Sequence, residues 1–138
     1  MNLFSVPLSI PGEAVWLEAG CLVFAEMAPS AAVGAERAAA CNGSTALVQL
    51  QDDGPLTVRS RRPGDWIRPV GLGGRKKLQD YFVDRKLPRD VRDLIPLVVD
   101  RFDRIIWVAG YTIDDQFGVT DPAQPVLLLG LKVVGGSA

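Results

Sequence analysis

Residues 56–88 read LTVRSRRPGDWIRPVGLGGRKKLQDYFVDRKLP, and this stretch contains most of the signals that decide the fold. It opens on 56–60, a short run with alternating apolar residues that predicts a β-strand. Pro63-Gly64-Asp65 then predicts a turn, and 71–74 is a glycine-rich loop. The apolar spacing after the loop changes from strand-like to helical, so strands and helices are both expected here.

A helix is expected over about 75–85, with Lys76 and Lys77 near its start. Four of its residues recur at i, i+3, i+4 and i+7, which places them on one face: Leu78, Tyr81, Phe82 and Arg85. Pro88 ends this helix. A shorter helix is expected over 88–93, with proline in its favoured first turn.

Short apolar runs on both sides of the central stretch predict further strands: 14–17, 21–27, 46–50, 97–99, 104–109 and 126–134. We therefore expect one α+β domain, a mostly antiparallel sheet carrying one or two short helices. Residues 28–44 hold seven alanines and are interrupted by glycines. We interpret them as a mobile connector, with a short exposed helix as the alternative.

A chain of 138 residues with 48% hydrophobic side chains can bury one ordinary core. Its N-terminus lacks the basic start and long apolar run of a secretory signal. The most apolar region, 125–134, is too short to span a bilayer and is interrupted by Lys132. We therefore expect no membrane association and a cytoplasmic location, with Cys21 and Cys41 as reduced thiols.

The sequence contains no histidine. Its absence removes the commonest general base, the Ser-His and Cys-His pairs and the commonest metal ligand. The two cysteines lack the spacing of a metal site. We expect no catalytic residue, no metal site and no cofactor in this chain, although acid–base work by Asp80 or Asp84 beside lysines remains an alternative.

Basic residues are concentrated in one segment, although the net charge is only −1. Residues 59–92 hold eleven Lys or Arg and four Asp, which gives 11 − 4 = +7. The remainder has 15 − 11 = 4 bases and 16 − 4 = 12 acids, which gives −8. A local positive field of this kind attracts phosphate and indicates a polyanionic partner.

Two groups within the segment suggest phosphate contacts. Arg59 and Arg61 would project from the same face of a strand, where a phosphate backbone supplies the anions that keep them together. An edge strand guarded by charge is the alternative.

The loop 71–74 could bring its backbone and a following helix start close to an anion, with Lys76 and Lys77 beside it. A solvated helix paired to Asp80 is the alternative.

Three pieces of sequence follow one another in a fixed order. They are Leu-Thr-Val-Arg-Ser-Arg-Arg-Pro-Gly-Asp at 56–65, Gly-Gly-Arg-Lys-Lys-Leu-Gln-Asp-Tyr-Phe-Val-Asp-Arg-Lys-Leu-Pro at 73–88, and Ile-Trp-Val-Ala-Gly at 106–110. Arg92 and Pro96-Leu97 lie between the last two. The string resembles the C-terminal domain of bacterial tRNA(Ile)-lysidine synthetases, and Ser-Ile-Pro-Gly at 9–12 fits the entry to that region.

The resemblance implies a role in a ligase that uses ATP to form lysidine at the wobble cytidine of isoleucine tRNA. That chemistry, with its ATP and magnesium, belongs to an N-terminal pyrophosphatase-type domain that this sequence lacks. The C-terminal region helps to bind tRNA towards the acceptor stem. The chain could be one domain of the longer enzyme or a free-standing relative.

We therefore expect a non-catalytic tRNA-binding domain whose partners are tRNA and the catalytic domain of the same enzyme. The expected RNA-contacting residues are Arg59, Arg61, Arg62, Arg75, Lys76, Lys77, Arg89 and Arg92. The alternative is a packing module whose basic face docks on an acidic protein surface.

Overall fold

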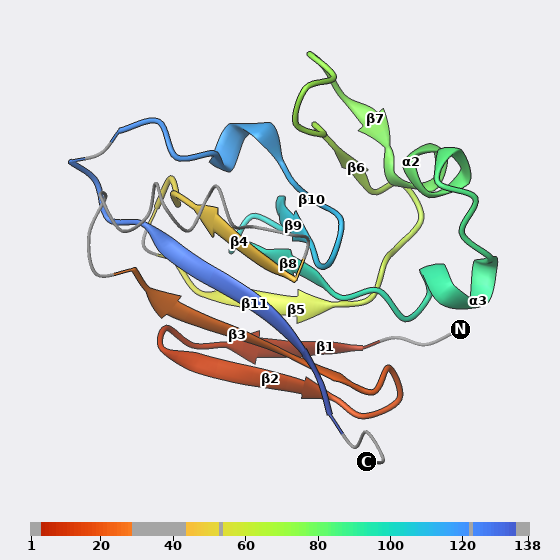
Figure 1. Cartoon of the computed structure of the whole chain (residues 1–138), viewed down its shortest axis with the longest axis horizontal. Coiled ribbons are helices and arrows are strands. Elements are labelled where there is room, and N and C mark those ends of the chain that lie inside the picture. Colours follow the sequence, from red (N-terminus) through yellow and green to blue (C-terminus); the bar gives the residue numbers. More distant parts are fainter. Residues whose placement is uncertain (1–3, 29–43, 53, 122, 135–138) are drawn as a thin grey trace.

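The computed structural model describes residues 4–28, 44–52, 54–121 and 123–134. These residues form two larger antiparallel sheets and a small unit of one hairpin and two helices (Figure 1). The expected α+β class, mostly antiparallel and with two short helices, is confirmed. The expected connector at 28–44 lies outside the described residues, except for its first and last positions.

The five-stranded sheet has the order β1-β5-β8-β9-β10. Its strands are β1 (Ser5–Leu8), β5 (Leu56–Arg59), β8 (Leu97–Val99), β9 (Ile105–Val108) and β10 (Thr112–Ile113). The four-stranded sheet has the order β2-β3-β11-β4. Its strands are β2 (Gly12–Trp16), β3 (Cys21–Met27), β11 (Leu127–Val133) and β4 (Thr45–Val48).

The main core lies between these two sheets, each of which contributes one face. Val58 and Ile106 come from the five-stranded sheet, and Val23 and Leu129 from the four-stranded sheet. All four side chains are almost fully buried. Burying one such side chain contributes roughly 1.5–3 kcal/mol, so this layer accounts for much of the stability.

The hairpin-and-helix unit covers the other face of the five-stranded sheet (Figure 1). It consists of β6 (Trp66–Ile67), β7 (Lys76–Lys77), α2 (Leu78–Asp84) and α3 (Arg89–Arg92). Ile67 and Phe82 pack there against Leu97 and Val99 of β8 in a second core. Because both faces of β8 and β9 are covered, these strands read as continuous apolar runs without alternation.

The helix expected over 75–85 begins later, at Leu78. Lys76 and Lys77 instead form β7, where they pair with Ile67 and Trp66 of β6. The predicted apolar face of the helix is confirmed for three residues, Leu78, Tyr81 and Phe82, which are buried. The prediction that two lysines occupy the first helical turn is wrong, because a strand pairing takes those residues.

Four short strands were not predicted: β1, β6, β7 and β10. Three of them have only two residues, and β6 and β10 are followed by a loop or a short turn. The 3₁₀ helix η1 (Asp115–Phe117) was also not predicted. Elements of two or three residues leave almost no periodicity in the sequence, and β1 depends on pairing with the distant β5.

Candidate nucleic-acid interface

A groove of about 480 Å³ lies where the turn after β5 meets the start of α2 and the helix α3. It brings together five of the eight residues that the sequence predicted to contact RNA: Arg61, Arg62, Lys77, Arg89 and Arg92. These five residues define the basic groove. They come from three separate segments, so the fold, and not their order in the sequence, makes them neighbours.

The five cations differ in how strongly the chain holds them. Arg61 donates from Nε to the Asp93 carboxylate at 2.9 Å. Arg92 donates from Nε to the Leu87 carbonyl at 2.7 Å, which fixes its side chain beside the groove. Lys77 and Arg89 are exposed and have no ion pair within the described part of the chain. Both are therefore available to an external anion.

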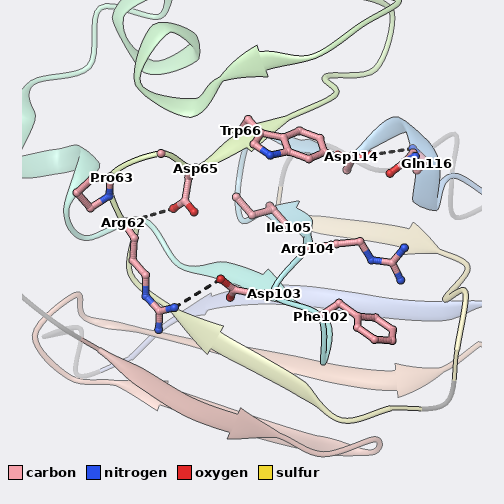
Figure 2. A pocket seen from close by; sticks show the side chains of 11 residues that line it. Arg62, Pro63, Asp65, Trp66, Phe102, Asp103, Arg104, Ile105, Asp114 and Gln116 are labelled. Carbon is pink, nitrogen blue, oxygen red and sulfur yellow. Dashed lines mark hydrogen bonds and ion pairs between the residues drawn. The ribbon is translucent and has the colours of Figure 1, made fainter.

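Arg62 lies at the edge of the groove and is about half exposed. Its Nη1 is 3.5 Å from the Asp103 carboxylate, and its backbone N–H donates to Asp65 at 2.7 Å (Figure 2). The Pro63-Gly64 turn that follows carries Gly64 at φ +88°, a conformation that glycine adopts without strain. The turn therefore presents Arg62 to solvent while anchoring its backbone.

The structure removes Arg59 from the predicted RNA-contacting set, because its side chain is only 1% exposed. Nη1 and Nη2 donate to the two oxygens of Asp65 at 3.0 and 2.8 Å, and Nε donates to Asp103 at 2.9 Å. Burial lowers the pKa of Arg59, but the two carboxylates outweigh it and raise the pKa above its ordinary value. Arg59 is a permanently charged structural residue that an RNA strand cannot reach.

Two further predicted residues lie outside the groove. Successive residues of a strand point to opposite sides, so Lys76 turns away from the groove that Lys77 lines. Lys76 pairs with Asp84 of α2 and lines a separate pocket of about 450 Å³. Arg75 is exposed and its guanidinium carbon lies 4.7 Å from the centroid of the Trp66 ring.

The loop 71–74 leads into β7 and not into a helix start, so the predicted anion site at a helix N-terminus is wrong. Gly71 and Gly73 have φ values of +87° and +81°, and a Cβ at either would meet no atom within 4 Å. These two glycines serve the turn of the hairpin. They do not make room for a close neighbour.

Sequence reasoning missed the carboxylates that hold the cations in place. Asp93 and Asp103 lie outside the basic segment in the sequence, yet they bond Arg61, Arg62 and Arg59. No local pattern identifies them, because each is separated from its partner by more than thirty residues. The groove can therefore bind a polyanion through a few free or half-free cations, and not through the whole charge of the segment.

No helix within the described ranges is long and apolar enough to cross a membrane. In the same part of the chain, no three or more Cys, Asp or Glu side chains gather in a way that could hold a metal ion. The residues of the groove offer cations and hydrogen-bond donors, which suit phosphate oxygens.

The domain class is defined by comparison with known proteins. A solved structure described as "Crystal structure of TILS C-terminal domain" superposes with a TM-score of 0.79 and 26% identity, covering 98% of this chain and all of that one. A family model described as "TilS substrate C-terminal domain" matches residues 56–129. The chain belongs to this family of C-terminal domains.

Its curated relatives are tRNA(Ile)-lysidine synthases. That of Symbiobacterium thermophilum is 42% identical over 111 residues, which are 80% of this chain and 22% of the relative. The synthase of Persephonella marina is 38% identical over 63% of this chain and 19% of the relative. The synthase of Bacillus subtilis is 48% identical over 41% of this chain and 12% of the relative. The chain thus spans about a fifth or less of these relatives, and it corresponds to an accessory domain of the ligase, as the sequence predicted.

Proposed function

We propose that this domain binds the acceptor side of tRNA through the basic groove. In the whole enzyme it would thereby support ATP-dependent lysidine formation on isoleucine tRNA, the reaction for which its relatives are named. The domain itself contributes binding and no catalytic group. The observation that carries the proposal is that five predicted phosphate-contacting cations, taken from three segments, line one groove.

The chemistry of the groove favours a duplex backbone. A-form RNA is recognised largely through phosphates and 2′-hydroxyls, so a cationic surface with hydrogen-bond donors suits a stem. Lys77 and Arg89 are exposed and unpaired within the described residues, while Arg61 and Arg92 are oriented by Asp93 and a backbone carbonyl. Pre-oriented guanidiniums lose less side-chain entropy when they bind phosphate.

The test is the affinity of the chain for a fluorescent acceptor-stem hairpin of isoleucine tRNA, measured by anisotropy. Lys77→Ala combined with Arg89→Ala should weaken binding by about tenfold or more, because two charge-assisted contacts are lost. The matched control is Arg101→Ala combined with Lys132→Ala, which removes one arginine and one lysine outside the groove. The control should bind within about twofold of the unchanged chain.

Three results would contradict the proposal. The unchanged chain could fail to bind the hairpin, the control could lose as much affinity as the groove variant, or the groove variant could bind normally. Weak RNA binding together with salt-sensitive binding of an isolated catalytic domain would favour the alternative role as a packing module.

A further inference from the structure

A second pocket, of about 330 Å³, adjoins the basic groove on the other side of the Pro63-Gly64 turn. The two cavities share Arg62, Pro63, Gly64 and Asp65, so they lie next to each other with that turn between them. Trp66 and Phe102 also line the second pocket, and Figure 2 shows them towards opposite sides of the view, with Ile105 between them. We call it the Trp66 pocket.

The two aromatic rings are unusually open to solvent for this protein. Trp66 is 37% and Phe102 is 59% exposed, whereas Trp16 and Trp107 are 3% and 1% exposed. Exposed aromatic rings beside a nucleic-acid groove are the usual platforms on which unpaired bases stack. Neither ring is needed to fill the two described cores.

Arginines flank Trp66 without closing the pocket. The guanidinium carbons of Arg68 and Arg75 lie 5.1 and 4.7 Å from the centroid of its ring. Neither arginine lines the Trp66 pocket, and Trp66 remains 37% exposed beside them. These cations hold the indole in place and keep the rim positive, which suits the phosphates on either side of a bound base.

The interior of the pocket carries both charges. Its acidic lining residues are Asp65, Asp103 and Asp114, and its basic lining residues are Arg62 and Arg104. Asp65 forms an ion pair with Arg59. Asp114 accepts hydrogen bonds from the backbone N–H groups of Arg68 and Gln116. Asp103 is about half exposed and can accept further hydrogen bonds. The exocyclic amino group of cytosine, adenine or guanine would find an acceptor in Asp103.

We propose that the Trp66 pocket binds one unpaired nucleobase with an exocyclic amino group, next to the duplex in the basic groove. The base stacks on Trp66 and donates from its amino group towards Asp103. A volume of about 330 Å³ falls within the usual range for small-ligand pockets. The inference rests on the proposed function, because the groove must bring the duplex to the pocket.

The test compares a blunt acceptor-stem hairpin with the same hairpin carrying a short 3′ overhang of cytidines. The overhang should raise the affinity of the unchanged chain by about tenfold, the usual scale of one base–aromatic stack. Trp66→Ala should abolish that gain and leave blunt-hairpin binding unchanged, and Trp66→Phe should retain most of it. Leu72→Ala is the matched control, since it removes an exposed apolar side chain between β6 and β7 outside the pocket and should keep the gain.

Two further readouts test the base and its contact. An overhang of uridines should give less gain than one of cytidines, and Asp103→Asn should reduce that difference. Tryptophan emission reports directly on the pocket, because Trp66 is exposed while the other two tryptophans are buried. The cytidine overhang should quench this emission, and the blunt hairpin should not.

The outcomes separate the pocket from the groove. If the blunt hairpin binds but the overhang adds nothing, or if Trp66→Ala weakens both hairpins equally, the pocket proposal is overturned and the groove proposal stands. If neither hairpin binds, both fall. If Trp66→Ala leaves both RNAs unaffected but impairs lysidine formation by the full-length enzyme, the pocket contacts protein, and the nucleobase assignment is wrong.

Discussion

The Arg59 guanidinium joins the end of β5 to two later loops through Asp65 and Asp103. Its charge is buried, and three of its hydrogen bonds go to carboxylates. Breaking a buried pair is costly because the partner charge is left without compensation in a poorly solvated site. The turn that presents Arg62 and Pro63 to the groove depends on this arrangement.

Arg59→Met should lower the free energy of unfolding by about 3–5 kcal/mol, because it leaves the mostly buried Asp65 carboxylate without its counter-charge. Arg62→Met should cost no more than about 1 kcal/mol, as for an exposed ion pair. Urea denaturation followed by circular dichroism measures both. Adding Asp65→Asn to Arg59→Met should recover part of the loss, and a strictly additive double variant would refute the coupling.

Tyr81 carries a buried hydroxyl that meets no partner at good hydrogen-bond geometry among the described residues, although the Arg85 guanidinium lies beside it. A polar group buried in this way is destabilising, so Tyr81→Phe should raise the free energy of unfolding by about 1–2 kcal/mol. A loss of stability in this variant would mean that the hydroxyl is satisfied. Tyr111→Phe, at a partly exposed position, is the control and should change little.

The same residue makes an alkaline prediction. Burial raises the pKa of Tyr81 in the folded chain, although the nearby Arg85 opposes this. The folded state therefore keeps a proton that the unfolded state begins to lose near pH 10. Stability is complete below that pH and falls as the pH rises through the folded-state pKa. Thermal melts across this range should show a smaller fall in Tyr81→Phe.

At the scale of elements, α2 is fixed by what it packs against. Phe82→Ala should cost about 3–5 kcal/mol, because the ring is fully buried in the second core. Lys76→Ala should cost no more than about 1 kcal/mol, since it removes only an exposed ion pair with Asp84. If Lys76→Ala lowers the melting temperature more than Phe82→Ala does, the buried face assigned to α2 is wrong.

The sequence predicted elements with clear apolar runs and missed most elements of two or three residues. β3 and β8 were predicted with their observed bounds, because their apolar runs are long or uninterrupted. The start of α2 was placed three residues too early, because nothing in the local spacing shows that 76–77 pair with β6. Five of the eight residues predicted to contact RNA line the basic groove, but the burial of Arg59 depends on Asp103, 44 residues away.

At the scale of the whole molecule, the charge separation of +7 against −8 is partly cancelled by the fold. Asp93 and Asp103 both come from the acidic part of the sequence. Asp93 forms an ion pair with Arg61, and Asp103 forms ion pairs with Arg62 and Arg59. The electrostatic field at the basic groove is therefore set by its five cations and the flanking arginines. It is weaker than the sum over the segment.

Five phosphate contacts predict a definite salt dependence. Log affinity against log salt should have a slope of about −4 to −5, at roughly −0.9 per neutralised phosphate, borrowing the value for duplex DNA. Affinity should then fall more than about a hundredfold between roughly 50 and 200 mM salt. Anisotropy across a salt series measures the slope, which Lys77→Ala with Arg89→Ala should make shallower by about 2. A flat dependence would exclude phosphate contacts as the main source of affinity.

The position of β11 in the four-stranded sheet has a consequence for synthesis. β11 pairs with β3 on one side and with β4 on the other, although both precede it in the chain by roughly eighty residues or more. While the ribosome is delivering the chain, β3 and β4 therefore have no strand between them until residues 127–133 leave the exit tunnel. Open strand edges are prone to pair with other chains. A chain that stops before Leu127 would therefore leave this sheet divided, with β3 and β4 each exposing an edge that could pair with another chain.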